Sequence, residues 1–273
     1  MLDRLDLSAV RAVALDVDGT LAGDDAQVSE RAIVAMRAVA ALGIPVIVLT
    51  GRSRRNTLEI ARRVGLRHTV VACNGALVID PTTEHNLLVS PVSDDGKQAF
   101  RQLADDLALD LTWWTEHELY VSRQGPMIEL LWELNRERAM VADPDTIVDS
   151  VVLKMMAMGP PSHLDAVADE IERRVPGAAR SMDNLIEVVH PDSTKWHALQ
   201  WVLQRYGIDP THVLGAGDGG NDVVWLSRIG LPVAMGNARP EVLRVALAEA
   251  PSNIDDGAAA LLERLIEVQE ARA

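Results

Sequence analysis

Three short apolar segments alternate with two helical segments in the first 75 residues, and this alternation restricts the fold more than any other feature. The apolar segments are residues 10–15, 45–49 and 69–73, and residues 29–42 and 55–65 between them have helical patterns. Strands without polar alternation are buried on both faces, as in parallel sheets covered by helices. The sequence therefore predicts an α/β fold with a parallel-sheet core.

The same alternation returns in the last third of the chain. It predicts helices over residues 193–207, 221–230, 239–250 and 255–271, and strands over residues 212–217 and 232–235. These elements continue the sheet begun at the N-terminus, so we expect residues 1–80 and 189–273 to form one core domain.

Residues 81–188 have a different pattern. Helices are expected over residues 93–109 and 162–177, whereas the strand candidates at 111–122 and 151–158 carry mixed or bulky side chains. We interpret residues 81–188 as an inserted α/β domain, with Trp113 and Trp114 in its core.

Composition limits the function classes. The formal net charge of −14 disfavours nucleic acids and membrane surfaces as partners. Cys73 is the single cysteine, so no intrachain disulfide can form, and the first ten residues have no signal-peptide pattern. We therefore expect a cytoplasmic protein.

One long apolar segment, residues 32–50, could be taken for a membrane span. It contains Arg37 and is broken by Gly43 and Pro45. These residues favour a helix beginning at Ser29, a turn and a buried strand.

Four polar stretches stand out: Asp16 to Thr20, Thr50 to Arg52, Lys195, and Gly217 to Asp222. Three of them directly follow predicted strands. Ligands of open parallel sheets bind beyond the carboxyl ends of the strands, so we expect these stretches to meet in one crevice.

Two carboxylates one residue apart, Asp16 and Asp18, with Asp218 from another strand, would form an oxygen-rich anionic pocket. Such a pocket suits Mg²⁺ together with a substrate phosphate. One carboxylate could then attack phosphorus, and the second could protonate the leaving oxygen and later activate water. Thr50, Gly51 and Lys195 would hold the phosphoryl oxygens.

Each stretch has a simpler interpretation when it stands alone. Asp-x-Asp-Gly is a common turn, and a lone Lys195 is most often a solvated helix residue. The four stretches in this order, three of them at strand ends, favour function.

The sequence resembles the haloacid dehalogenase-like hydrolase superfamily, and within it the Cof-type phosphatases of subfamily IIB. "DVDGTL", "LTGR", Lys195 and "GAGDGGND" resemble the four family motifs, and "CNGA", "VAMGNA" and "NIDDGAAALLERL" agree. The resemblance implies a Rossmann-like core with a cap inserted between the second and third motifs. Trp196 and His197, where the family usually has a glycine, and Gly220, where many relatives have glutamate, depart from the pattern.

The resemblance also implies roles for individual residues. Asp16 would be the nucleophile and Asp18 the acid and base, with Mg²⁺ held by Asp16, the Asp18 backbone carbonyl and Asp218. The remaining implied roles are phosphate contacts by Thr50, Gly51, Lys195 and Asn221, and support of the metal site by Asp222. Apart from the resemblance, Asn74 and His190 are candidate substrate contacts. His190 stands just before the motif lysine, and its alternative role is to mark the linker between cap and core.

The leading prediction is a Mg²⁺-dependent phosphomonoesterase that acts on a small phosphorylated metabolite resembling a sugar phosphate. A phosphotransferase or phosphomutase shares all four motifs, and a catalytically idle regulator on the same fold remains a further alternative. A carbon-halide hydrolase is disfavoured because it needs no acid at Asp18. The oligomeric state does not follow from these residues.

Overall fold

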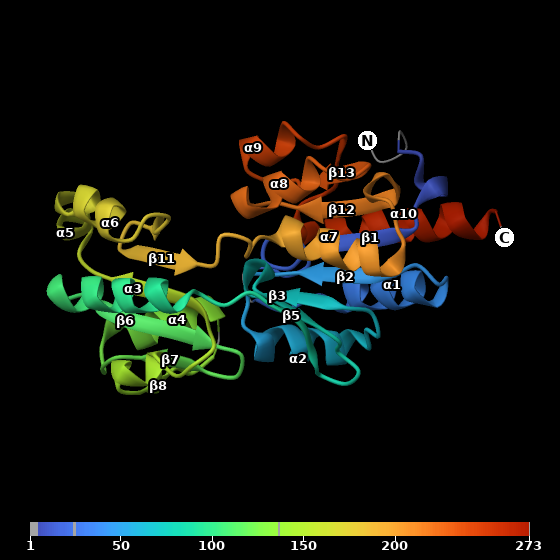
Figure 1. Cartoon of the computed structure of the whole chain (residues 1–273). Coiled ribbons are helices and arrows are strands. Elements are labelled where there is room, and N and C mark those ends of the chain that lie inside the picture. Colours follow the sequence, from blue (N-terminus) through green and yellow to red (C-terminus); the bar gives the residue numbers. More distant parts are fainter. Residues whose placement is uncertain (1–4, 24–25, 136, 273) are drawn as a thin grey trace. The chain divides into compact units, whose positions relative to one another are not determined.

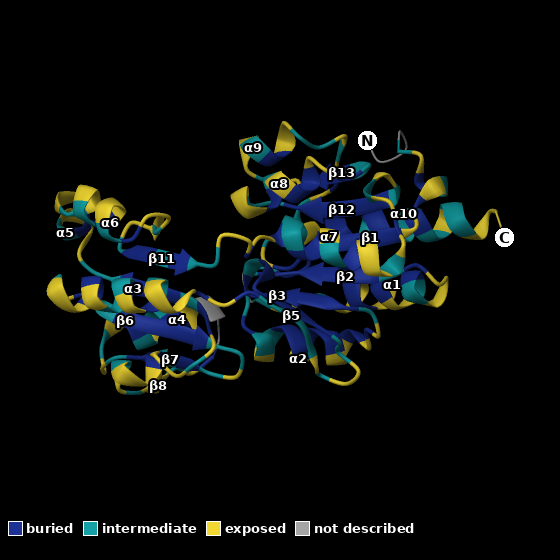
Figure 2. Cartoon of the chain, viewed as in Figure 1, coloured by how far each residue is buried: buried dark blue, intermediate teal, exposed yellow. Residues whose placement is uncertain are grey.

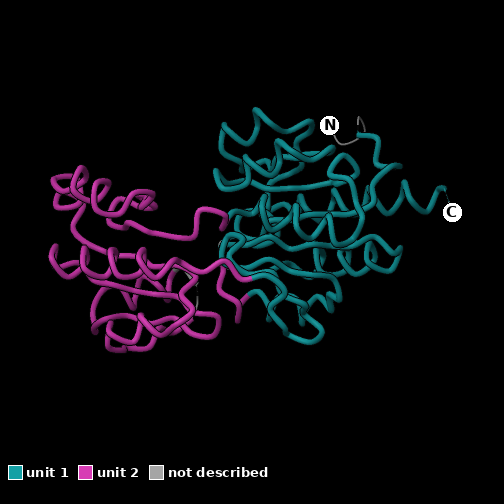
Figure 3. The backbone as a smooth tube through the Cα atoms, viewed as in Figure 1, with its two compact units in different colours: residues 1–51, 57–88, 194–273 teal, residues 52–56, 89–193 magenta. Residues whose placement is uncertain are grey.

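The computed structural model of the protein describes residues 5–23, 26–135 and 137–272 (Figure 1). The chain forms two compact units (Figure 3). The first contains residues 1–51, 57–88 and 194–273, and the second contains residues 52–56 and 89–193. The second unit is thus formed mainly by one central segment of the chain.

The first unit is built on an eight-stranded sheet in the order β14-β13-β12-β1-β2-β3-β4-β5. From β14 to β3 all neighbouring strands are parallel, and β4 runs antiparallel to β3. The predicted parallel-sheet core is confirmed. The strands are β1 (Ala12–Asp16), β2 (Val46–Leu49), β3 (Val70–Ala72), β4 (Leu77–Ile79), β5 (Asn86–Val89), β12 (Val213–Gly217), β13 (Leu231–Ala234) and β14 (Ala248–Glu249).

The central strands are buried on both faces because helices cover both (Figure 2). One face packs against α7, α8 and α9. On the other side, α1 packs against β2 and α10. The helices of this unit are α1 (Glu30–Ala41), most of α2 (Arg54–Val64), α7 (Lys195–Tyr206), α8 (Val223–Leu226), α9 (Pro240–Leu243) and α10 (Gly257–Glu270).

Side-chain caps fix where α1 and α7 begin. The Ser29 hydroxyl accepts from the amide of Ala32 at 3.1 Å, as expected for the start of α1. The Thr194 hydroxyl accepts from the amide of His197 at 3.1 Å, so Lys195 is the first residue of α7. The cap at Thr194 therefore sets the position of the motif lysine.

The second unit contains a six-stranded sheet in the order β10-β11-β9-β6-β7-β8. Trp113 and Phe100 are fully buried in its core, and Trp114 is 2% exposed, as expected for residues of a domain core. Its elements are α3 (Asp94–Asp106), β6 (Asp110–Thr115), β7 (Leu119–Val121), α4 (Pro126–Asn135), β8 (Met140–Val141), β9 (Val152–Met158), α5 (Pro161–Ala166), α6 (Ala168–Arg174), β10 (Ala179–Met182) and β11 (Leu185–Val189).

Two of the helix predictions are wrong. Residues 239–250 form only the short α9 and then the edge strand β14, because the Leu247 amide donates to the Pro232 carbonyl at 2.8 Å and the Ala250 amide donates to Ala234. Pairing at the open edge of the sheet overrides helix propensity here. The helix over residues 162–177 is divided into α5 and α6 at Val167, whose φ of −111° and ψ of 12° are not helical.

The apolar segment 32–50 folds as the end of α1, a turn and the buried strand β2, as predicted. No helix within the described part of the chain has both the length and the apolar character that a membrane crossing requires.

Candidate active site

Strand order brings the polar stretches of the first unit together. Strands β12, β1 and β2 are parallel neighbours, with Leu15 opposite Ala216 and Asp16 opposite Leu49. Their carboxyl ends therefore lie at one edge of the sheet. Asp16 ends β1, Thr50 follows β2, and Asp218 follows β12.

Lys195 joins two of the carboxylates. Its ammonium donates to Asp16 Oδ1 at 2.5 Å and to Asp222 Oδ1 at 2.7 Å. All three residues are at least 96% buried, so this cluster is shielded from solvent. Although burial opposes its charge, the two carboxylates raise the pKa of Lys195 above its usual range.

The carboxylates outnumber the lysine. One oxygen each from Asp16, Asp218 and Asp222 lies within 4.8 Å of the others. Burial and the Asp222 carboxylate raise the pKa of Asp16 to about 8, although the Lys195 ammonium acts in the opposite direction. Burial and Asp222 also raise the pKa of Asp218 to about 6. The positive charge of one ammonium does not neutralise the negative charge of three carboxylates, so the cluster favours binding of a further cation.

Asp222 is fully engaged by protein donors. Its Oδ1 accepts from Lys195 and from the indole nitrogen of Trp225 at 2.9 Å, and its Oδ2 accepts from the amides of Asp218 and Gly219 at 3.1 and 3.0 Å. A carboxylate offers about four acceptor sites. Asp222 therefore orients Lys195 and the loop, which leaves Asp16 and Asp218 as the carboxylates suited to hold a metal.

Replacing Asp222 by alanine is expected to destabilise the protein by about 3 kcal/mol, because the Trp225 indole and two loop amides lose their acceptor and Lys195 loses one partner. The measurement is urea unfolding of the variant and the wild type. Asp209→Ala is the matched control, since the exposed Asp209 carboxylate also accepts from an amide, that of Thr211. Equal losses in the two variants would contradict the role given to Asp222.

A glycine allows the Asp218 loop to approach the end of β1. Gly19 has a φ of +82°, and a Cβ at this position would lie 2.3 Å from Asp218 Oδ2. The side-chain amide of Asn237 donates to the Gly19 carbonyl at 2.8 Å and holds the turn.

The oxygen-only donor set of Asp16 and Asp218 fits a hard divalent cation. The Asp18 side chain is exposed and lies outside the group of three carboxylates.

The predicted phosphate contacts surround a tight turn at Cys73–Gly75. Thr50 is buried, and its carbonyl accepts from the Asn74 amide at 2.9 Å. Asn221 Nδ2 donates to Asn74 Oδ1 at 3.0 Å. The first unit thus brings together Asp16, Thr50, Gly51, Asn74, Lys195, Asp218, Asn221 and Asp222.

The remaining expected contact, His190, lies in the second unit. Its Nδ1 accepts from the Asp192 amide at 3.1 Å, and its carbonyl accepts from the Ser193 amide. These bonds build a turn just before α7.

Trp196 departs from the family pattern beside the motif lysine. It packs in the first unit, with the Arg228 guanidinium carbon 5.2 Å from the centroid of its ring.

Sequence reasoning overlooked Trp225 and the contact between Asn74 and Asn221. The i to i+3 spacing from Asp222 to Trp225 could have indicated the hydrogen bond between these two residues, whereas no local signal indicates the bond between Asn74 and Asn221.

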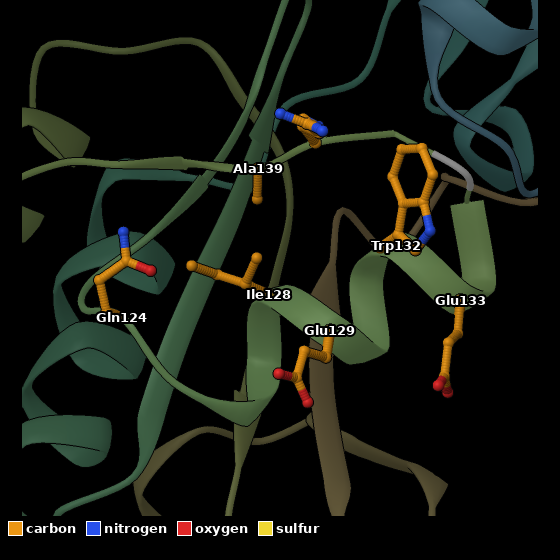
Figure 4. Close-up of a pocket in the computed structure, with 7 residues that line it drawn as sticks. Gln124, Ile128, Glu129, Trp132, Glu133 and Ala139 are labelled. Carbon is orange, nitrogen blue, oxygen red and sulfur yellow. The ribbon is translucent and has the colours of Figure 1, made fainter.

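A separate pocket of about 510 Å³ in the second unit, beside α4, contains none of the predicted site residues (Figure 4). Its lining residues are Gln124, Ile128, Glu129, Trp132, Glu133, Arg138 and Ala139.

A family model described as haloacid dehalogenase-like hydrolase matches residues 13–262. The chain belongs to this family. The predicted family is therefore confirmed, and with it the expectation that this hydrolase is an enzyme of the phosphatase class.

Curated relatives cover almost the whole of this hydrolase. A phosphoglycolate phosphatase of Methanopyrus kandleri is 28% identical over 268 residues, which are 95% of this chain and 98% of the relative. The 5-amino-6-(5-phospho-D-ribitylamino)uracil phosphatase YcsE of Bacillus subtilis is 26% identical over 259 residues, which are 92% of this chain and 93% of the relative.

A solved haloacid dehalogenase-like hydrolase from Bacteroides thetaiotaomicron has the same fold. Its TM-score is 0.86 at 23% identity, and the match covers 94% of this chain and 99% of that one.

Proposed function

We propose that the protein is a Mg²⁺-dependent phosphomonoesterase that works through an aspartyl-phosphate on Asp16. The observation that carries the proposal is the buried Lys195 ammonium between Asp16 and Asp222, with Asp218 beside them at the ends of parallel strands. Asp16, the Asp18 carbonyl and Asp218 would hold the metal. Bound there, Mg²⁺ would offset the carboxylate charge that otherwise repels a phosphate.

In the first step, a carboxylate oxygen of Asp16 attacks phosphorus, and the bond between phosphorus and the ester oxygen breaks. Asp18 gives its proton to the leaving oxygen, which departs as an alcohol. Asp18 is exposed two residues beyond the end of β1, so a substrate and water can both reach its carboxyl group. In the second step, Asp18 takes a proton from water, and the water oxygen displaces Asp16 and yields inorganic phosphate.

Four further groups would stabilise the phosphoryl oxygens while the bonds change. Lys195 supplies a fixed positive charge, and its two carboxylate partners hold the ammonium in place. The Thr50 hydroxyl and the Gly51 amide stand at the end of β2, next to Asp16 in the sheet register. The Asn221 amide is the fourth expected contact.

We propose a small phosphorylated metabolite as the substrate. Two relatives that match over nearly the whole chain are named for the small substrates phosphoglycolate and a ribitylaminouracil phosphate. The net charge of −14 also disfavours a polyanionic partner. Because the phosphate-handling residues lie in the first unit, we place the choice of leaving group in the second unit, between residues 111 and 190.

Initial rates with Mg²⁺ on hexose phosphates, nucleotides and a phosphopeptide test this proposal. We expect the best small sugar phosphate to react at least tenfold faster than the phosphopeptide, which corresponds to about 1.4 kcal/mol in the barrier. Released inorganic phosphate is measured without an added acceptor, so that hydrolysis is distinguished from phosphoryl transfer. A phosphopeptide that reacts as fast as the best small substrate would contradict the proposed substrate class.

A further inference from the structure

The turn at Cys73–Gly75 contacts three other segments of the first unit that carry predicted phosphate contacts. The Asn74 amide donates to the Thr50 carbonyl, and the Asn74 side chain accepts from Asn221. A Cβ at Gly75 would lie 2.2 Å from the carbonyl oxygen of Thr194, so this glycine packs directly against the residue before Lys195.

The backbone of this turn is unusual. Cys73 has a φ of 51°, Asn74 a φ of 54° with ψ of 28°, and Gly75 a φ of 104°. Consecutive left-handed residues are unfavourable for most side chains, and asparagine is among the few that tolerate this conformation. Such strained backbone persists where the surrounding contacts hold it, and it is concentrated at functional sites.

The conformation aims the Asn74 side chain between two of the segments. A Cβ at Gly51 would lie 3.1 Å from Asn74 Oδ1, and Asn221 Nδ2 is 3.0 Å from the same oxygen. Asn221 is exposed and lies in the short 3₁₀ turn Gly220–Asp222. The Asn74 side chain is the hydrogen-bond acceptor that the described residues provide for the Asn221 side-chain amide.

We propose that Asn74 is a positioning residue that acts through Asn221. One N–H of the Asn221 amide is held by Asn74, and the amide nitrogen carries a second N–H that can face a phosphoryl oxygen. The inference rests on the proposed function, because that function assigns Asn221 to the phosphate. It adds that the Asn221 contact is preorganised by a residue 147 positions earlier in the chain.

A double-mutant cycle tests the inference. The variants are Asn74→Gly, which keeps the left-handed backbone accessible, Asn221→Ala, and the two combined. The readouts are KM and kcat on one substrate and the Kd of inorganic phosphate with Mg²⁺. We expect Asn74→Gly to raise both the KM and the phosphate Kd about 3- to 10-fold, as for a lost hydrogen bond, with kcat changed less.

The combined variant decides the matter. If Asn74 acts through Asn221, Asn74→Gly causes no further rise when Asn221 is already alanine. A rise of the same factor in both backgrounds would overturn the inference while leaving the proposed function intact. Failure of the proposed function has a different signature, because the wild type would then neither bind phosphate with Mg²⁺ nor release it.

A control variant and an NMR measurement complete the test. Ala108→Gly is the matched control, since the exposed Ala108 has a φ of 52° and lies in the second unit with no proposed role, and it should leave both constants unchanged. If Asn74→Gly does not fold, NMR relaxation of the Asn221 side-chain amide in the wild type without ligand replaces it. A restricted amide supports the inference, and a freely mobile amide overturns it.

Discussion

Asp16→Asn is expected to lower the rate of phosphate release by about 10⁴-fold or more, because an amide cannot attack phosphorus to form the acyl phosphate. Asp16 is 4% exposed, and its Oδ1 lies 2.5 Å from the Lys195 ammonium, so its carboxylate is held beside a proposed phosphate contact. The measurement is release of inorganic phosphate from the best substrate with Mg²⁺. Phosphate release within tenfold of the wild type would remove Asp16 from the nucleophile role.

The same variant is expected to keep the fold. Burial and Asp222 raise the pKa of Asp16, which means that its charge is disfavoured in the folded state. Removing this charge leaves Lys195 paired with Asp222 at 2.7 Å. Thermal unfolding should therefore occur at the same temperature as in the wild type or higher. Glu59→Gln, at an exposed position of α2, is the control and should retain both activity and stability.

Removal of divalent metal with EDTA is expected to abolish activity, and Mg²⁺ should restore it whereas Ca²⁺ should not. Asp16 and Asp218 provide few, hard oxygen ligands, which suits Mg²⁺ with its retained waters. Ca²⁺ takes six to eight oxygens in looser geometry and could engage both oxygens of the attacking carboxylate. Full activity in excess EDTA would point to a mechanism without metal.

The pH dependence of metal binding has a defined sign. Burial and Asp222 raise the pKa of Asp218 to about 6, and a carboxylate binds Mg²⁺ only when it has lost its proton. Affinity for Mg²⁺ should therefore increase as pH rises through about 6 and fall as the solution is acidified. Calorimetric titration at pH 5.5 and pH 7.5 measures the difference. Asp218→Asn should bind Mg²⁺ weakly at both values.

The residues at strand ends were predictable because their signals are local. A buried apolar run followed at once by Asp16, Thr50 or Asp218 identifies both the strand and the edge where the side chains meet. The family, the parallel-sheet core and the start of α1 at Ser29 were predicted in this way. The individual catalytic roles stay predictions for the experiments above.

Contacts between distant or weakly patterned segments could not be predicted. The hydrogen bond from Asn221 to Asn74 joins residues 147 positions apart, and nothing in either short segment specifies the other. The strand β14 was mistaken for helix because its conformation depends on the free edge of β13, to which Ala248 and Glu249 pair. In both cases tertiary pairing decides the local structure.

The position of β1 in the sheet has a consequence for synthesis on the ribosome. β1 pairs with β2 on one side and with β12 on the other, yet β12 begins only at Val213. The first half of the sheet therefore emerges with one edge of its central strand unpaired, while most of the second unit, residues 89–193, is still to be made. An unpaired apolar edge is prone to association with other chains. We expect the nascent first unit to depend on chaperone protection until about residue 217 has left the exit tunnel, whereas the second unit can fold earlier.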